Sequence, residues 1–245
     1  PAPLPDTEPL TMTGDLSAQM VAGIDRFLTE KTAEVTKRRG EFWKRDLSSP
    51  SAYETSIETN RAWFKRIIGL PDSRAQFDDL QLLETSNRPS RLAETAKYSI
   101  HSVRWPAFDN VHAEGLWLKQ KENTTGVVIC IPDADQTPEM LCGLELGINQ
   151  DAQFARTLAE NGFEVFVPVL ISRSDTFSGN PEMNRFTNFP HREWVYRQAY
   201  EMGNHIIGYE VQKVLALVDW LERRGEKDIG LAGYGEGGLL ALYSA

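Results

Sequence analysis

The chain has 245 residues, 41% of them hydrophobic, and its charged side chains sum to a formal net charge of −9. This composition excludes a disordered or collagen-like protein, and the length suits one or two domains. The acidic balance argues against a protein that binds the phosphates of DNA or RNA, so we expect no nucleic-acid partner. No run of about 18 apolar residues occurs, so we also expect no membrane span.

The first 71 residues predict a helical N-terminal segment. Apolar residues between positions 20 and 35 recur at helical spacing, and Asp15 can cap the start of that helix. A second helical pattern begins near Ser51 and stops at Gly69. Both helices are expected to lie in residues 1–71.

Two features flank this helical segment. The chain starts with a proline-rich stretch and without Met, which fits a removed signal peptide, so a secreted or periplasmic location is one hypothesis. Residues 72–97 are polar and weakly patterned, and we expect a linker there with one short strand.

The two cysteines, Cys130 and Cys142, cannot make a disulfide framework. One bridge is an option, but two buried free thiols are expected.

From Tyr98 onward the hydrophobic pattern changes. Residues 98–105 and 111–118 flank a turn at Asp109-Asn110 and predict an antiparallel pair of strands. Residues 126–131 are continuously apolar, which is typical of a strand buried on both faces. Further segments are expected in chain order: a helix at 150–161, a strand at 163–170, a polar insertion at 172–204, a helix ending near 225, a strand at 228–233 and a helix from 239.

That order predicts an α/β domain over residues 98–245, with a mostly parallel sheet opened by an antiparallel hairpin. The chain stops in the first turns of the last helix, after a strand that should lie in the middle of a sheet. An unpaired strand edge leaves backbone N–H and C=O groups without partners. We therefore expect the rest of the same polypeptide, beyond residue 245, to complete the sheet, so that 98–245 is the N-terminal half of the domain.

A glycine-rich turn joins the last strand to the last helix and fits two motifs. Gly233-x-Gly235-x-x-Gly238 matches the dinucleotide-binding pattern, in which a helix N-terminus binds a pyrophosphate. Gly233-Tyr234-Gly235-Glu236-Gly237 matches the nucleophile elbow G-x-S-x-G, with glycine where serine belongs. A plain packing turn is a third interpretation. The elbow is favoured, because several strands precede the turn and only seven residues follow Gly238, too few to supply the acidic ribose contact.

With the elbow, residues 98–245 resemble the α/β-hydrolase superfamily, and within it the acetyl xylan esterase and dienelactone-hydrolase-like branch. The resemblance implies a carboxylic-ester hydrolase fold, an acylated polysaccharide as partner, and no cofactor or metal. It rests on segments in the expected order, which include Val103-Arg104-Trp105-Pro106, Glu114-Gly115-Leu116-Trp117-Leu118, Gly126-Val127-Val128-Ile129-Cys130-Ile131-Pro132-Asp133, Val218-Asp219-Trp220-Leu221 and the glycine turn.

The resemblance also implies which catalytic groups are present. In the family an elbow serine attacks the ester carbonyl, and an acid and a histidine follow later in the chain. Gly235 takes the serine position and the other two would lie beyond residue 245, so we assign no catalytic side chain. The oxyanion-hole donors would be the backbone N–H groups of Ala134 and Glu236. Asp133 and Asp135, which flank Ala134, depart from the family's sequence, and a capped turn is their plainer interpretation.

The polar insertion carries the candidate substrate-binding residues, Arg173, His191 and Arg192. Ligands of α/β sheets bind outside the carboxyl ends of the strands, where this insertion should fold. These side chains could grip a sugar, or they could form a salt-bridged surface, and both interpretations stay open. For Glu236 we favour complementarity to the positive end of its helix over a catalytic role.

Four functional hypotheses follow. The first is a degenerate or non-catalytic hydrolase domain that has lost its elbow serine. The second is an active esterase with an engineered or unusual site. The third is a module that binds a polysaccharide or a protein, and the fourth is a dinucleotide-binding domain.

Overall fold

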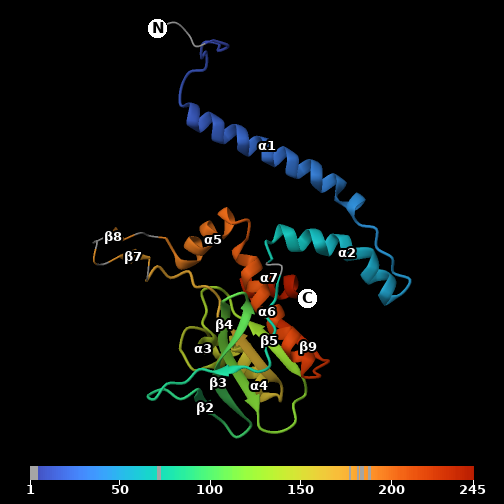
Figure 1. Cartoon of the computed structure of the whole chain (residues 1–245), viewed down its shortest axis with the longest axis vertical. Coiled ribbons are helices and arrows are strands. Elements are labelled where there is room, and N and C mark those ends of the chain that lie inside the picture. The colour runs from blue at the N-terminus through green and yellow to red at the C-terminus, as the bar shows by residue number, and fades with distance from the viewer. Residues whose placement is uncertain (1–4, 71–72, 177, 181, 183–184, 187–188) are drawn as a thin grey trace. The chain divides into compact units, whose positions relative to one another are not determined.

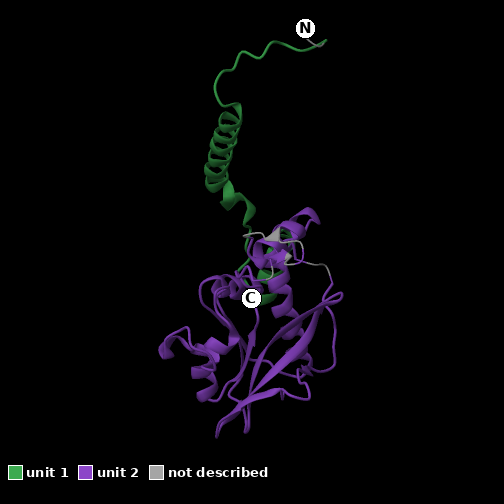
Figure 2. Ribbon diagram, turned by 90° about the vertical axis from the view of Figure 1, so that its left-hand side faces the viewer, with its two compact units in different colours: residues 1–64 green, residues 65–245 purple. Residues whose placement is uncertain are grey.

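The structure of the chain is a computed structural model. It describes residues 5–70, 73–176, 178–180, 182, 185–186 and 189–245. The chain divides into two compact units, Pro1–Phe64 and Lys65–Ala245 (Figure 2). All strands of the described residues belong to the second unit.

The first unit consists of helices. α1 (Leu16–Arg38) begins where Asp15 Oδ1 accepts a hydrogen bond from Ala18 N at 3.0 Å. A short 3-10 turn, η1 (Arg39–Phe42), follows it, and α2 (Pro50–Ile67) runs across the boundary between the units. Both helices expected in the N-terminal segment are present, and the apolar stripe at residues 20–35 lies on α1.

The second unit is built on a seven-stranded sheet in the order β1-β3-β4-β6-β5-β9, with β2 also paired to β3. β3 (Tyr98–Phe108) and β4 (Val111–Gln120) form the expected antiparallel hairpin, and Asp109 adopts φ 43° in its two-residue turn. β5 (Val127–Ile131), β6 (Glu164–Pro168) and β9 (Ile229–Gly233) run parallel to one another, whereas β4 is antiparallel to β6. A parallel part opened by an antiparallel hairpin is the expected arrangement.

Helices cover both faces of this sheet (Figure 1). The short α3 (Pro138–Cys142) and α4 (Phe154–Glu160) pack on one face, in a cluster that includes Cys130 and Val165. α6 (Ile206–Arg223) and α7 (Glu236–Ser244) pack against each other and the opposite face.

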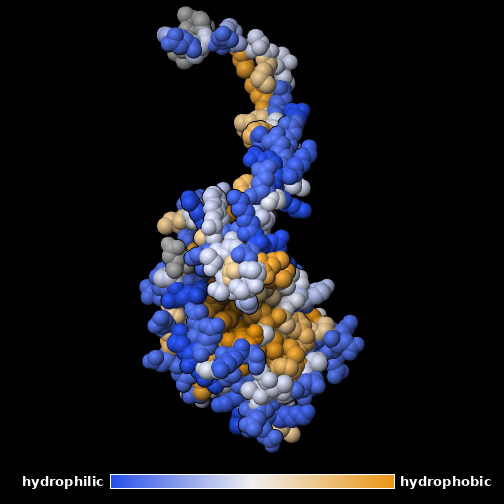
Figure 3. All heavy atoms as spheres, turned by 90° about the vertical axis from the view of Figure 1, so that its right-hand side faces the viewer, coloured by the Kyte–Doolittle hydropathy of each residue, from blue (hydrophilic) through white to orange (hydrophobic). Residues whose placement is uncertain are grey.

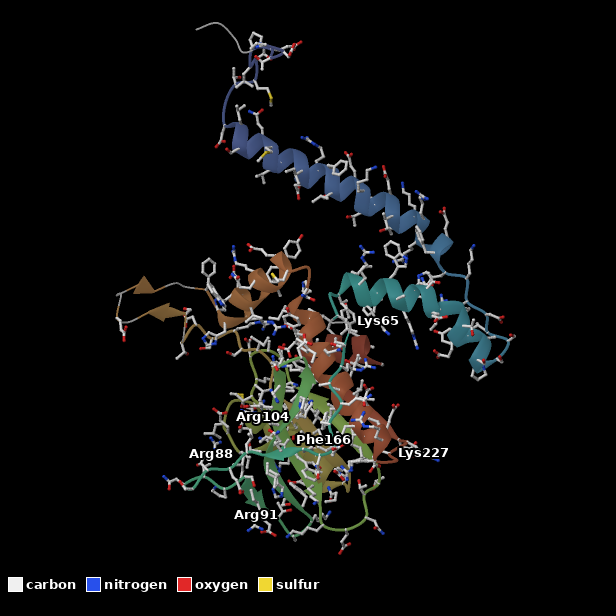
Figure 4. The ribbon with its side chains drawn as sticks, viewed as in Figure 1. Lys65, Arg88, Arg91, Arg104, Phe166 and Lys227 are labelled. Carbon is white, nitrogen blue, oxygen red and sulfur yellow. The ribbon has the colours of Figure 1, made fainter. Side chains whose placement is uncertain are left out.

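Phe166 lies at the centre of the core on the α6 side (Figure 4). Its side chain is fully buried, stacks on Trp117 with ring centroids 5.7 Å apart, and meets Trp220 edge-on at 6.1 Å. Its neighbours in β6, Val165 and Val167, point to the other face and are also buried. Burial on both faces explains why these strands read as continuous apolar runs.

Some segments hold more regular structure than the sequence predicted. Residues 72–97 contribute β1 (Gln81–Leu82) and β2 (Arg91–Glu94), both paired with β3, where a linker with one strand was expected. The insertion at 172–204 carries β7 (Gly179–Asn180), β8 (Arg185–Phe186) and α5 (His191–Glu201), which lie beyond one end of the sheet (Figure 1). Since α5 mixes charged and aromatic residues without an apolar stripe, periodicity does not reveal it.

Other expectations concern boundaries and cysteines. The division into segments 1–71, 72–97 and 98–245 stays a prediction, and residues 71–72 lie outside the described residues. Cys130 and Cys142 are buried free thiols, as expected. Within the described ranges, no helix has both the length and the apolar character needed to cross a membrane.

β9 ends the strand order of the sheet. Beside it lies a hollow whose lining includes Val218, Leu231 and Leu242. Apolar side chains gather on this face of the second unit (Figure 3). This edge is where the sequence analysis expected a further strand.

Candidate functional site

Three strands end together at one edge of the sheet. β6, β5 and β9 are parallel neighbours, so their carboxyl ends lie side by side. The chain leaves β5 through Asp133 and Ala134, and it leaves β9 through Gly235 into α7. Arg173 follows the end of β6. Because ligands of α/β sheets bind at such an edge, it is the candidate site.

The turn between β9 and α7 is a sharp hinge. Gly235 adopts φ 56° and ψ −125°, a conformation that residues with a side chain rarely adopt. A Cβ on Gly233 would lie 2.2 Å from the Gly237 carbonyl oxygen, and a Cβ on Gly237 would lie 2.1 Å from the Ile131 carbonyl oxygen. These two glycines therefore allow β9, α7 and β5 to approach one another. Residues 233–237 have the strand–turn–helix context that a nucleophile elbow requires.

The Asp133 carboxylate lies against this hinge. Its Oδ1 atom accepts hydrogen bonds from the backbone N–H of Ala134 at 2.9 Å and from that of Glu236 at 3.0 Å. These are the two groups that the resemblance named as oxyanion-hole donors. Both N–H groups do point to one oxygen atom, and that atom is Oδ1 of the protein's own Asp133.

The same contact bears on the dinucleotide hypothesis. A pyrophosphate would have to bind the N–H groups at the start of α7. The Glu236 N–H already donates to Asp133, whose negative charge would repel a phosphate. The position of β9, after six other strands of the sheet, also differs from the first βαβ unit in which this motif normally occurs.

Beyond the hinge, the Glu236 side chain joins two arginines. It forms ion pairs with Arg192 and, at 3.2 Å, with Arg173. Arg173 also pairs with Asp135 at 2.8 Å. The two acids that flank Ala134 thus have different partners: Asp135 contacts an arginine and Asp133 contacts the hinge. Glu236 is the first residue of α7 and is held in ion pairs with both arginines; its role in complementing the helix dipole stays a prediction.

A buried acid extends this network into the core. Glu210, on α6, has no exposed surface; its Oε1 accepts a hydrogen bond from Ile171 N at 2.8 Å and pairs with Arg192 at 3.4 Å. Its other oxygen pairs with Lys213. Burial lowers the pKa of the Arg192 guanidinium, and the charge of Glu210 opposes that shift. An arginine nevertheless stays charged at any physiological pH, so this is a buried cluster of opposite charges.

The remaining candidates lie around α5. His191 is its first residue, with Nδ1 3.3 Å from Ser172 Oγ. His205 instead caps α6: its Nδ1 accepts from Ile207 N at 3.0 Å, and burial, followed by the charge of Arg192, lowers its pKa. A shallow hollow lies beside the ion pairs, and its lining consists of Arg173, Pro190, Arg192, Glu193, Tyr196 and Ile206.

Sequence reasoning did not foresee two of these features. Asp133 was expected in a capped turn, and its contact with residue 236 joins positions 103 apart in the chain. Glu210 was not singled out, because an acid inside an apolar helical pattern carries no sign of its partners. The sequence did carry one signal for the contact of Asp133 with the hinge. Asp133 and Gly235 both depart from the family's pattern, and each follows the end of a strand in the parallel part of the sheet.

Metal binding is not supported by a cluster of ligands. In the part of the chain that the structure describes, no three His, Cys, Asp or Glu side chains are grouped so that they could hold a metal ion. The carboxylates of Asp133 and Asp135, which flank Ala134, are engaged with N–H groups and with Arg173 respectively.

Solved structures with a similar fold include esterases. A protein described as a candidate acetyl xylan esterase from Bacteroides fragilis NCTC 9343 gives a TM-score of 0.57 at 16% identity, covering 83% of this chain and 54% of that one. The methylesterase BT1017 gives a TM-score of 0.50 at 13% identity, covering 80% of this chain and 39% of that one. Acetyl xylan esterase 1 from Thermoanaerobacterium sp. JW/SL YS485 gives 0.47 at 14% identity, covering 76% and 53%. At these identities the likeness shows the fold alone.

Other comparisons address the sequence. No curated protein sequence matches this chain. The chain spans about half the length or less of the three solved structures above. The family model described as "Dienelactone hydrolase family" matches residues 118–245, which is more than half of the chain and includes the β9–α7 hinge. This chain therefore belongs to the dienelactone hydrolase family, and its fold is that of an α/β-hydrolase.

Proposed function

We propose that this chain is a non-catalytic hydrolase domain that keeps a binding cleft for acylated polysaccharide. The observation that carries the proposal is Gly235 at the elbow, with φ 56° and no side chain at the position of the nucleophile. Acyl transfer through a serine needs a hydroxyl that can form a covalent bond to the carbonyl carbon. Glycine supplies no such group.

The state of the oxyanion donors supports the same proposal. Stabilisation of a tetrahedral intermediate requires N–H groups that are free to meet the developing negative charge. Here the N–H groups of Ala134 and Glu236 donate to Asp133 Oδ1. A substrate carbonyl would have to displace a carboxylate, and its oxyanion would develop next to that carboxylate's charge.

The hollow beside the ion pairs and the likeness in fold to a candidate acetyl xylan esterase favour an acylated sugar as the ligand. The arginines that line it, Arg173 and Arg192, are paired with carboxylates of the chain, so an acidic sugar would have to compete with those carboxylates. Tyr196 offers an aromatic ring that is 38% exposed, which suits stacking against a neutral acetylated sugar. A secreted or periplasmic location, where such polysaccharides occur, fits this proposal.

Titration calorimetry with acetylated xylo-oligosaccharides tests the binding part. We expect Tyr196→Ala to weaken binding about tenfold, the size typical of losing one aromatic contact. Trp194→Ala is the matched control, because Trp194 lies on the same helix, is 57% exposed and does not line the hollow. Equal effects of both changes, or no binding by the unaltered protein, would contradict a polysaccharide cleft at this place.

Hydrolysis of 4-nitrophenyl acetate tests the catalytic part. We expect the protein to release nitrophenol no faster than buffer alone does. A rate well above buffer would overturn the assignment as non-catalytic.

One contact favours a second candidate, an esterase with a relocated nucleophile. Ser172 Oγ lies 3.3 Å from His191 Nδ1, the kind of pair in which a histidine can take a proton from a serine hydroxyl. Ser172→Ala separates the two proposals: it leaves a background rate unchanged, but it abolishes a rate that depends on this pair.

A further inference from the structure

Asp133 and the position of residue 235 compete for the same space. An ideal Cβ placed on Gly235 would lie 2.6 Å from Asp133 Oδ2, 2.7 Å from Cγ and 2.9 Å from Oδ1. Non-bonded carbon atoms in folded proteins approach to about 3.5–4.0 Å at their optimum. The carboxylate therefore fills the volume that any side chain at residue 235 would need.

The carboxylate is held firmly in that volume. Two N–H groups donate to Oδ1, and hydrogen bonds to an ionised acceptor are stronger than neutral ones. The Asp133 backbone is itself fixed by Gln136, which accepts from Asp133 N at 3.2 Å and donates its own N–H to the Asp133 carbonyl at 2.9 Å. Moving the carboxylate would leave two donors without partners, which costs free energy.

We propose that Asp133 is an internal plug of the elbow, which occupies the two N–H donors and excludes a side chain from residue 235. Gly235 is then required by its neighbour as well as by its backbone conformation. It follows that returning serine to residue 235 does not rebuild a nucleophile site unless the carboxylate is removed too. This inference goes beyond the proposed function, since it concerns what fills the elbow and holds whether or not another group hydrolyses esters.

A double-mutant cycle in thermal unfolding tests the plug. Gly235→Ser is introduced into three backgrounds: the unaltered chain, Asp133→Ala, which empties the volume, and Asp133→Asn, which keeps the size and removes the charge. We expect serine to lower the Tm by about 8 °C or more in the unaltered and Asp133→Asn chains, and by about half as much in the Asp133→Ala chain. Equal losses in all three backgrounds would overturn the proposal.

A second measurement does not depend on the Asp133→Ala chain folding. Gly203 also has a positive φ, +77°, but a Cβ there would meet nothing within 4 Å, so Gly203→Ser introduces backbone strain without a collision. We expect Gly235→Ser to shift the amide resonance of Ala134, which lies far from residue 235 in the chain, as the carboxylate leaves its N–H group, and Gly203→Ser to leave that resonance in place. An unmoved Ala134 resonance in the Gly235→Ser chain would contradict the plug.

Discussion

The core and the carboxyl-end rim of the sheet are built from different interactions. Around Phe166 the core is apolar. Its stability comes from removing apolar surface from water, which requires no specific partner for each side chain. At the rim, the carboxylates of Asp133, Glu210 and Glu236 each have named partners. Apolar positions accept residues of similar volume, whereas a buried charge needs its own counter-charge. A substitution at the rim therefore affects a specific partner, such as the two N–H groups that donate to Asp133.

The largest expected effect is on the core. Phe166→Ala removes a fully buried ring from between two tryptophans and should lower the free energy of unfolding by about 4 kcal/mol. Urea denaturation measures the change. Val111→Ala, at a strand position that is 42% exposed, should cost less than about 1 kcal/mol. Similar losses for both variants would show that Phe166 is not central to the core.

The next effect is on the buried charges of the rim. Glu210→Gln keeps the size of the side chain but leaves Lys213 and Arg192 without their shared carboxylate, so we expect a loss of about 3 kcal/mol in urea denaturation. Glu193→Gln breaks an exposed pair with Arg197 on α5 and should cost less than about 0.5 kcal/mol. A loss for Glu210→Gln as small as this control would show that the rim does not depend on paired charges.

A smaller effect depends on pH. Neutral His205 accepts the capping hydrogen bond of α6, and burial lowers its pKa in the folded state below the ordinary 6.5. The unfolded chain therefore takes up the proton first as pH falls. The stabilisation is complete above about pH 6.5 and is lost as pH falls through the lower folded-state value.

His205→Asn is the reference variant for this pH dependence of stability, because asparagine keeps a capping acceptor but does not titrate near neutral pH. Between pH 7.5 and 5 the unaltered protein should lose about 1 kcal/mol of unfolding free energy relative to the variant, the size of a typical N-cap. Parallel pH profiles for the two proteins would contradict the assignment.

The last prediction concerns solvent access to the two buried cysteines and involves no change in stability. Burial raises the pKa of Cys130 to about 12, and it also raises the pKa of Cys142. Because only the thiolate reacts with iodoacetamide, labelling at pH 8 should be about 1000-fold slower in the native protein than in urea. Fast labelling of the native protein would show that water reaches this side of the sheet.

Much of the fold could be predicted from local patterns. The alternation around Asp109-Asn110, the apolar runs that became β5 and β6, and the helical spacing in α6 are written in neighbouring residues. The strands β1 and β2 were missed in part because they have two and four residues, too few for a pattern to develop. α5 was missed because charged residues surround its few aromatic ones, and its place depends on contacts with other elements.

The candidate site divides in the same way. The sequence by itself determined the glycine-rich hinge with Gly235 at its centre, because this follows from residue types in a fixed order between one strand and one helix. Only the tertiary structure decided that Asp133 accepts from two backbone N–H groups and that Arg173 and Arg192 are bound by acids of the chain. The physical reason is distance along the chain: these partners come from segments far apart in the sequence, and a hydrogen bond or ion pair exists only where folding brings two groups within about 3 to 4 Å.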